Sequence, residues 1–159
     1  MRKIDDLLYE YGLSHQNETN KTIHWICVPA IFFSIVGLIY SIPTDFLSGL
    51  MPFLGSFANW ATLILVLILF YYVSLSPPLA LGMFFFSAVC LALANLIDLV
   101  SPIPLWAISI GIFVIAWIFQ FWGHKIEGKK PSFLKDLQFL LIGPAWLMHF
   151  IYKKLGLAY

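Results

Sequence analysis

Four long apolar segments dominate this 159-residue sequence and leave few folds open to it. A membrane-spanning helix needs about 20 mostly apolar residues, and four segments meet this requirement: 23–42, 57–75, 78–97 and 105–122. Hydrophobic residues make up 61% of the chain and charged residues 11%, against about 45–50% and about 25% in an ordinary soluble domain. We therefore predict an all-α integral membrane protein with four transmembrane helices, in a single domain over residues 1–159.

The positive charges all lie on one side of these four predicted spans. Every Lys and Arg precedes the first span or follows the fourth, whereas the opposite loops contain only Asp45 and Asp98 as charges. Because Lys and Arg are retained on the cytoplasmic side of short loops, we predict that both termini are cytoplasmic, in a bacterial inner membrane or the endoplasmic reticulum. No basic run is long enough to indicate a nucleic-acid partner.

The last apolar segment, 137–152, is shorter and contains Gly143-Pro144 near its centre. Proline removes a helix hydrogen bond, and lysines flank the segment at both ends. Crossing the membrane would leave two lysines on the wrong side, so we predict a broken, re-entrant segment that returns to the cytoplasmic face. A tilted fifth span is the alternative, and it would carry His149 away from the other histidines.

All four histidines lie at the predicted cytoplasmic side, and two of them, His15 and His24, frame the entry to the first span. On one continuous helix their nine-residue separation would put the two rings on opposite sides. The polar segment 16–20 can break the helix, with Thr19 or Asn20 as the N-cap of the span. A short N-terminal helix carrying His15 can then fold back over the helix start that carries His24.

A second group of polar residues lies at the exit from the fourth span. Gln120 and His124 share a helix face, and Glu127 follows His124 by about one turn. Gly123 has no side chain to obstruct a neighbour. An amide or carboxylate beside a metal-bound imidazole fixes the orientation of the ring, so Gln120 and Asn20 are predicted supports, and Glu127 is a predicted support or a direct ligand.

These residues also have simpler interpretations. A single histidine at a membrane interface is most often an anchor, but the gathering of histidines on one face favours a metal site made by His15, His24 and His124. Lys125 and Lys129 are predicted to determine topology, with contact to an anionic lipid or a substrate carboxylate as the second interpretation. The many Phe and Trp side chains are predicted to face lipid or the interface.

Several other chemistries lack their signatures in this sequence. It contains no HExxH, GxSxG or Walker motif. Four histidines are too few for the two metal centres of the integral-membrane di-iron hydroxylases and desaturases, so a mononuclear site remains. Two classes compete with an enzyme: a non-enzymatic lipid-binding or scaffold protein, and a four-helix bundle that binds b-type haem.

Two motifs, one at each end of the chain, resemble those of a known family. The motifs are Tyr11-x3-His15-x4-Asn20-x3-His24 running into Pro29, and Gln120-x2-Gly123-His124-x2-Glu127-x3-Pro131 followed by Gly143-Pro144. With the four-helix spacing between them, they are similar to the membrane-embedded 2-hydroxy fatty acid dioxygenases of fatty-acid α-oxidation. Ser132 stands where that family is expected to have alanine, and His149 is not part of either motif.

The resemblance implies an Fe(II)-dependent dioxygenase that converts a 2-hydroxy fatty acid and O2 into the fatty acid one carbon shorter, CO2 and water. The substrate supplies all four electrons that O2 needs, so no reductase, flavin or 2-oxoglutarate is implied, and no protein partner. The implied site holds iron on His15, His24 and His124, with His149 as a candidate fourth ligand. Glu127 or Tyr11 would accept the hydroxyl proton, and the acyl tail would lie between helices among membrane lipids.

Overall fold

The computed structural model describes residues 2–128 and 133–159, and these residues form helices and no strands. The helices are, in chain order, α1 (Lys3–Gly12), α2 (Glu18–Tyr40), α3 (Asp45–Leu50), the short 3-10 helix η1 (Pro52–Phe57), α4 (Trp60–Leu75), α5 (Pro77–Val100), α6 (Leu105–Glu127) and α7 (Phe133–Lys154). The helical fold class is thereby confirmed.

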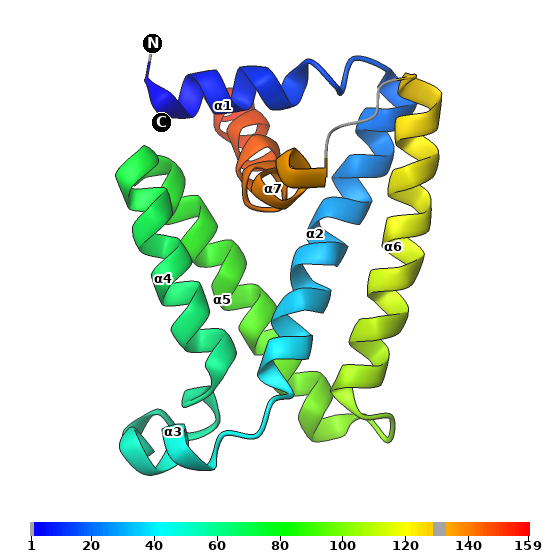
Figure 1. Cartoon of the computed structure of the whole chain (residues 1–159). Helices are drawn as coiled ribbons and strands as arrows, with labels where there is room; N and C mark the ends of the chain where they lie inside the picture. The colour runs from blue at the N-terminus through cyan, green and yellow to red at the C-terminus, as the bar shows by residue number, and fades with distance from the viewer. Residues whose placement is uncertain (1, 129–132) are drawn as a thin grey trace.

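The helices divide into a bundle and two groups at its ends. Figure 1 shows α2, α4, α5 and α6 running along the bundle, with α1 and α7 lying across one end and α3 at the other. The N- and C-termini lie close together beside α1. The start of α2 and the end of α6 therefore meet at the end of the bundle that holds α1 and α7.

Three helices in the described part of the chain are long and apolar enough to cross a membrane. They are α2, α5 and α6, with mean hydropathies of 2.1, 2.2 and 2.0 over their most apolar windows. The second predicted span, 57–75, corresponds to α4, which has 16 residues. Asn59 caps its start by accepting a hydrogen bond from the Thr62 backbone N–H at 2.9 Å. These helices indicate a membrane protein, and the count of four spans stays a prediction.

The entry to α2 differs from the prediction. The side chain of Asn17 accepts hydrogen bonds from the backbone N–H groups of Thr19 at 2.9 Å and Asn20 at 3.3 Å, so α2 begins at Glu18. The predicted caps Thr19 and Asn20 are therefore wrong, since both lie inside the first turn. His15 also lies in the linker after α1, not in the N-terminal helix where it was expected.

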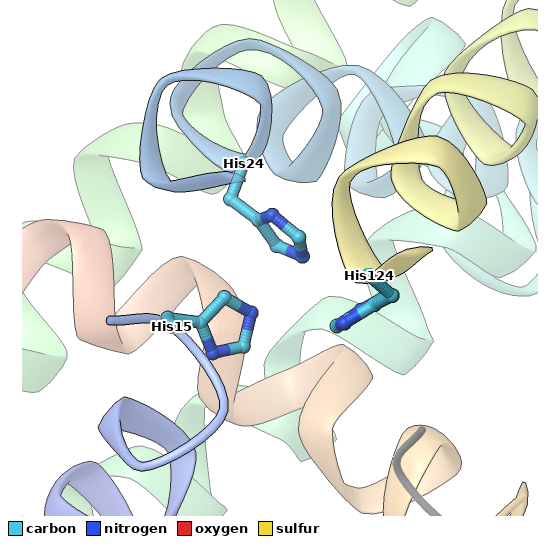
Figure 2. Close-up of side chains that lie close together, drawn as sticks. All are labelled: His15, His24 and His124. Atoms are coloured by element: carbon cyan, nitrogen blue, oxygen red, sulfur yellow. The ribbon is translucent and has the colours of Figure 1, made fainter. Parts of the chain in front are cut away.

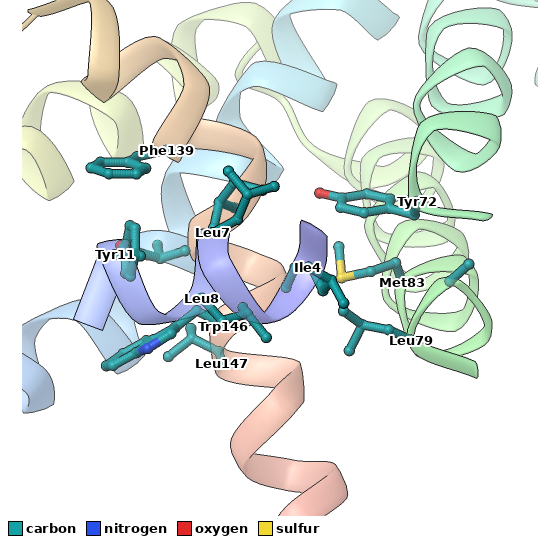
Figure 3. Close-up of a cluster of buried hydrophobic side chains, with 14 residues drawn as sticks. Ile4, Leu7, Leu8, Tyr11, Tyr72, Leu79, Met83, Phe139, Trp146 and Leu147 are labelled. Atoms are coloured by element: carbon teal, nitrogen blue, oxygen red, sulfur yellow. The ribbon is translucent and has the colours of Figure 1, made fainter. Parts of the chain in front are cut away.

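The short helix α1 is held in place by one apolar face. Its buried residues follow helical spacing, and Figure 3 shows them against side chains of α4, α5 and α7. The α1 residues are Ile4, Leu7, Leu8 and Tyr11, and their neighbours include Tyr72, Leu79, Met83, Phe139, Trp146 and Leu147. This contact fixes the helix that leads into the linker carrying His15.

The C-terminal segment is one continuous helix, α7, so the predicted break at Gly143-Pro144 is wrong. A Cβ atom built on Gly143 would lie 3.0 Å from the Tyr11 hydroxyl oxygen and 3.2 Å from a methyl group of Val28. The glycine thus permits α7 to approach α1 and α2 closely. Near the proline, the Tyr72 hydroxyl donates a hydrogen bond to the Leu141 carbonyl at 2.7 Å and ties α7 to α4.

Candidate metal centre

Three histidines from distant parts of the sequence converge at the end of the bundle. His15 comes from the linker after α1, His24 from α2 and His124 from the last turn of α6, and Figure 2 shows the three rings turned toward one another. One ring nitrogen of each lies within 4.8 Å of those of the other two. The ring planes meet at 68° to 80°. This is an arrangement in which one small ion can be bound by all three.

Backbone carbonyls orient two of the three rings. Nδ1 of His24 lies 2.9 Å from the Asn20 carbonyl oxygen, and Nδ1 of His15 lies 2.6 Å from that of Tyr11. A carbonyl can only accept, so each Nδ1 carries the hydrogen and each Nε2 keeps its lone pair. Nε2 of His15 is buried and has no hydrogen-bond partner among the described residues. Such oriented imidazoles are typical of metal sites, so the donor set fits a metal ion.

Burial also keeps the ring of His15 uncharged. Desolvation lowers the pKa of His15 to about 4, and the charge of His124 acts in the same direction. The hydrogen bond to the Tyr11 carbonyl and the Glu127 carboxylate oppose this shift without cancelling it. At neutral pH the imidazole is therefore neutral, which is the form that binds metal.

Acidification of the chelator-treated protein is expected to destabilise it through His15. Its pKa is about 6.5 when unfolded and about 4 when folded, so the unfolded state binds more protons between these values. The free energy of unfolding then falls as the pH falls from 6.5 to 4, by about 3 kcal/mol from this residue. Thermal unfolding in mild detergent at pH 7.5 and 4.5, for the native protein and His15→Gln, measures this. Equal pH dependence of the two proteins would contradict the burial of a neutral His15.

Aromatic side chains surround His15. The Tyr11 ring stacks on it at 4.1 Å with an interplanar angle of 10°, and the Trp146 ring lies 5.4 Å away. Trp146 is 4% exposed and also contacts Tyr11. The sequence interpretation assigned the aromatic residues mainly to lipid and missed this role, because nothing in the spacing of Trp146 links α7 to a linker more than a hundred residues earlier.

A cavity of about 650 Å³ opens beside the histidines. Its polar lining residues include His15, His124, Gln120 and Lys125, and its apolar lining residues include Val28, Ile31, Trp117, Phe121, Phe139 and Leu140. The indole Nε1 of Trp117 is buried without a hydrogen-bond partner in the described residues. Trp117 was also missed, although its spacing of three and seven residues from Gln120 and His124 puts all three on one helix face.

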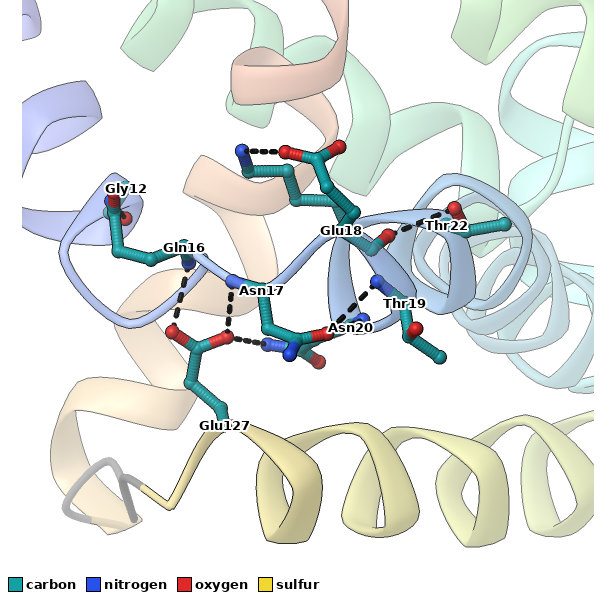
Figure 4. A network of polar contacts seen from close by, with 9 residues as sticks. Gly12, Gln16, Asn17, Glu18, Thr19, Asn20, Thr22 and Glu127 are labelled. Atoms are coloured by element: carbon teal, nitrogen blue, oxygen red, sulfur yellow. Dashed lines mark hydrogen bonds and ion pairs between the residues drawn. The ribbon is translucent and has the colours of Figure 1, made fainter.

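The predicted supporting residues do not share one role. Gln120 lines the cavity, as expected for a residue one turn from His124. Asn20 and Glu127 form a separate polar network with the linker between α1 and α2, drawn in Figure 4. Both carboxylate oxygens of Glu127 accept hydrogen bonds there, and Glu127 does not belong to the three-histidine cluster.

The remaining predicted site residues lie in three different places. Tyr11 and Lys125 line the cavity, whereas Lys129 lies outside the described residues. His149 is not brought into the cluster, because α7 presents Trp146 to His15 and His149 stands one turn further along. The His149 ring instead lies 4.9 Å from the ring of Tyr159.

The fold and the site together describe a helical membrane protein in which a three-histidine cluster borders a cavity lined by both polar and apolar residues. A sequence model of the Mpo1-like family, described as "2-hydroxy-palmitic acid dioxygenase Mpo1-like", matches residues 1–155. The chain belongs to this family.

One curated relative has a named activity. The chain is 30% identical over 149 residues to the 2-hydroxy-palmitic acid dioxygenase MPO1 of Saccharomyces cerevisiae, an alignment that covers 92% of this chain and 78% of the yeast protein. No solved structure matches the chain. The family predicted from the two motifs is thereby confirmed.

Proposed function

We propose that this protein is an Fe(II)-dependent dioxygenase that converts a 2-hydroxy fatty acid and O2 into the fatty acid one carbon shorter, CO2 and water. The observation that carries the proposal is the convergence of His15, His24 and His124 beside a cavity. Membership of the Mpo1-like family and the named activity of the yeast relative support the same chemistry.

The three histidines would hold the iron, because imidazole is a suitable ligand for Fe(II). Bound there, iron would supply the one-electron and O2 chemistry that side chains lack. The chain's own contribution is to keep the rings neutral and oriented: the carbonyls of Tyr11 and Asn20 hold His15 and His24. The aromatic rings around His15 exclude water from that side of the site.

The cavity suits an amphiphilic acid. Its volume of about 650 Å³ lies within the range of about 300–1,000 Å³ typical of ligand pockets. We assign the substrate carboxylate to the side of Lys125 and Gln120, and the acyl chain to the side of Val28 and Ile31. Tyr11 also lines the cavity and is the candidate acceptor of the hydroxyl proton.

The reaction balances without a further reductant. A 2-hydroxy acid and one O2 contain the atoms of the shortened acid, CO2 and one water, and oxidation of the substrate releases the four electrons that O2 takes up. Purified protein loaded anaerobically with Fe(II) and 2-hydroxypalmitate, then exposed to O2, is expected to form the C15 acid. Absence of that acid by mass spectrometry, with folded and iron-loaded protein, would remove the enzymatic proposal.

Narrowing the apolar side of the cavity is expected to change chain-length preference. Ile31 lines the cavity and is 2% exposed, so Ile31→Trp places a larger side chain where the acyl chain would lie. We expect kcat/KM for the C16 2-hydroxy acid to fall at least about tenfold relative to a C8 acid. The matched control is Ile118→Trp, because Ile118 is 61% exposed on α6. Equal losses for both acids in Ile31→Trp would contradict this placement of the chain.

We place the metal centre at the cytoplasmic face of the membrane, with both termini on that side. The end of the bundle that holds the histidines also carries the N-terminus and the C-terminal helix α7. Every Lys and Arg of the chain precedes α2, lies in its first turn, or follows Trp122. Positive residues are retained in the cytoplasm, and labelling of single cysteines introduced near each terminus tests the orientation.

A further inference from the structure

Glu127 does not line the cavity, and both of its carboxylate oxygens accept hydrogen bonds. One carboxylate oxygen accepts a hydrogen bond from the backbone N–H of Gln16 at 2.8 Å, and the other accepts from the backbone N–H of Asn17 at 2.9 Å. The second oxygen also accepts from the Asn20 side-chain amide at 3.1 Å. The last residue of α6 thus binds the linker that leads from α1 into α2, more than a hundred residues earlier, as Figure 4 shows.

These bonds bracket His15 in the chain. Gln16, the residue after His15, is held through its N–H by Glu127. The carbonyl of Ser14, the residue before His15, accepts a hydrogen bond from the Asn20 side-chain amide at 3.2 Å. The same amide group also donates to Glu127, so one network holds both peptide groups next to His15.

The network is anchored on the two helices that carry the other histidines. Asn20 is fully buried and lies one turn before His24 on α2, and Glu127 lies one turn after His124 on α6. Gly123 allows the two helices to meet here, because a Cβ atom at this position would lie 2.5 Å from the Asn20 side-chain oxygen. His15 lies in the linker after α1, where its backbone N–H donates to the Gly12 carbonyl at 3.0 Å. The network of Asn20 and Glu127 adds the contacts that hold this linker against α2 and α6.

We propose that Glu127 is a positioning residue that fixes the peptide of His15 against His24 and His124, and so sets the affinity of the site for iron. The inference rests on the proposed function for the identity of the metal. The sequence suggested three roles for Glu127, and the proposal develops the first of them, support of a histidine, in place of the other two, direct ligand and proton acceptor. A carboxylate that already accepts three hydrogen bonds and does not line the cavity is poorly placed for either of those roles.

Three variants test this role by iron affinity and turnover together. Glu127→Ala is expected to weaken Fe(II) binding by about 10–100-fold, the usual effect of losing an outer partner of a metal ligand. Its kcat at saturating Fe(II) should stay close to that of the native protein. Glu127→Gln keeps one accepting oxygen and should bind iron with intermediate affinity. Glu18→Ala is the matched control, since the Glu18 side chain is 88% exposed and contacts Lys21 at the start of α2.

The opposite pattern would overturn the proposal. A proton acceptor contributes about 10²–10⁴-fold to the rate. If Glu127 had that role, Glu127→Ala would bind iron with native affinity, but its kcat would fall by that factor even at saturating Fe(II). The kcat of Glu127→Gln would be equally low. Conversely, recovery of affinity in Glu127→Gln is a result that lost proton transfer does not produce.

Amide hydrogen exchange tests the hydrogen bonds between Glu127 and the linker without iron or substrate. In the metal-free protein, Glu127→Ala should expose the amides of Gln16 and Asn17 to at least about tenfold faster exchange, while the core of α6 keeps its native exchange. Unchanged exchange at these two amides would overturn the proposal whether or not the native protein binds iron. If the native protein does not bind iron but exchange is faster in Glu127→Ala, the proposed function is contradicted. The role of Glu127 in holding the linker is then still supported.

Discussion

Replacement of His24 by alanine is expected to abolish formation of the shortened acid. His24 is buried at the centre of the cluster, with its ring 4.2 Å from that of His15 and 4.9 Å from that of His124. Removing the His24 ring leaves two of the three nitrogen donors, and among the described residues the cluster contains no further side chain that could replace it. We expect turnover of 2-hydroxypalmitate to fall at least about 100-fold. Loss of a residue that only hydrogen-bonds a metal ligand costs about 10–100-fold in activity, and loss of a ligand itself should cost at least as much. The same loss is expected for His124→Ala.

The matched control is His149→Gln. His149 is a buried histidine at the same end of the bundle, but its ring contacts Tyr159 and stands apart from the cluster. This variant should keep turnover close to that of the native protein. Native activity in His24→Ala, or a loss in His149→Gln as large as that in His24→Ala with the fold intact, would contradict the assignment of the site to three histidines.

Replacement of Gly123 by alanine is expected to disturb both the fold and the site. The added Cβ would lie 2.5 Å from the Asn20 side-chain oxygen and 3.4 Å from a methyl group of Ile23. Asn20 cannot move away freely because it is fully buried and donates to Ser14 and Glu127. We expect a loss of about 1–3 kcal/mol in the free energy of unfolding, as for other overpacked sites. Weaker iron binding should accompany it.

A second glycine of the same helix provides the control. A Cβ atom on Gly111 would meet nothing within 4 Å, and alanine is the better helix former by about 1 kcal/mol. Gly111→Ala should therefore match or slightly exceed the native protein in thermal stability in detergent, with iron binding unchanged. Equal effects of the two substitutions would show that the close contact between Gly123 and Asn20 does not matter.

The parts of the molecule that depend on composition and local pattern could be predicted from the sequence. The apolar segments gave the helical class, and polar residues at the ends of the first and fourth segments gave the group formed by His15, His24 and His124. The helical class follows from rules that act over a few helical turns. The grouping follows from the prediction of four spans, which return the chain to the side where it starts. The hydrogen bonds between the Glu127 carboxylate and the linker could not be predicted from the sequence, because the positions of the backbone groups that donate them depend on the whole fold.

The errors share a cause, which is that tertiary contacts override a local preference. The local sequence Gly143-Pro144 predicts a helix break, but α7 continues through it. The glycine permits close contact with Tyr11. His149 lies apart from the three-histidine cluster, since the turn of α7 that faces His15 carries Trp146. Residue spacing alone does not determine the direction in which a helix runs. It also does not determine which face of that helix packs against a distant linker.

The central claim is that His15, His24 and His124 hold one iron per chain, and iron content tests it most directly. The native protein, His149→Gln and each of the three single alanine variants would be loaded anaerobically with Fe(II), freed of loose metal and analysed by mass spectrometry for iron per chain. We predict about one iron per chain in the native protein and in His149→Gln, and less than about a tenth of that in each alanine variant. Iron retained equally by all five proteins, or by none, would contradict the account.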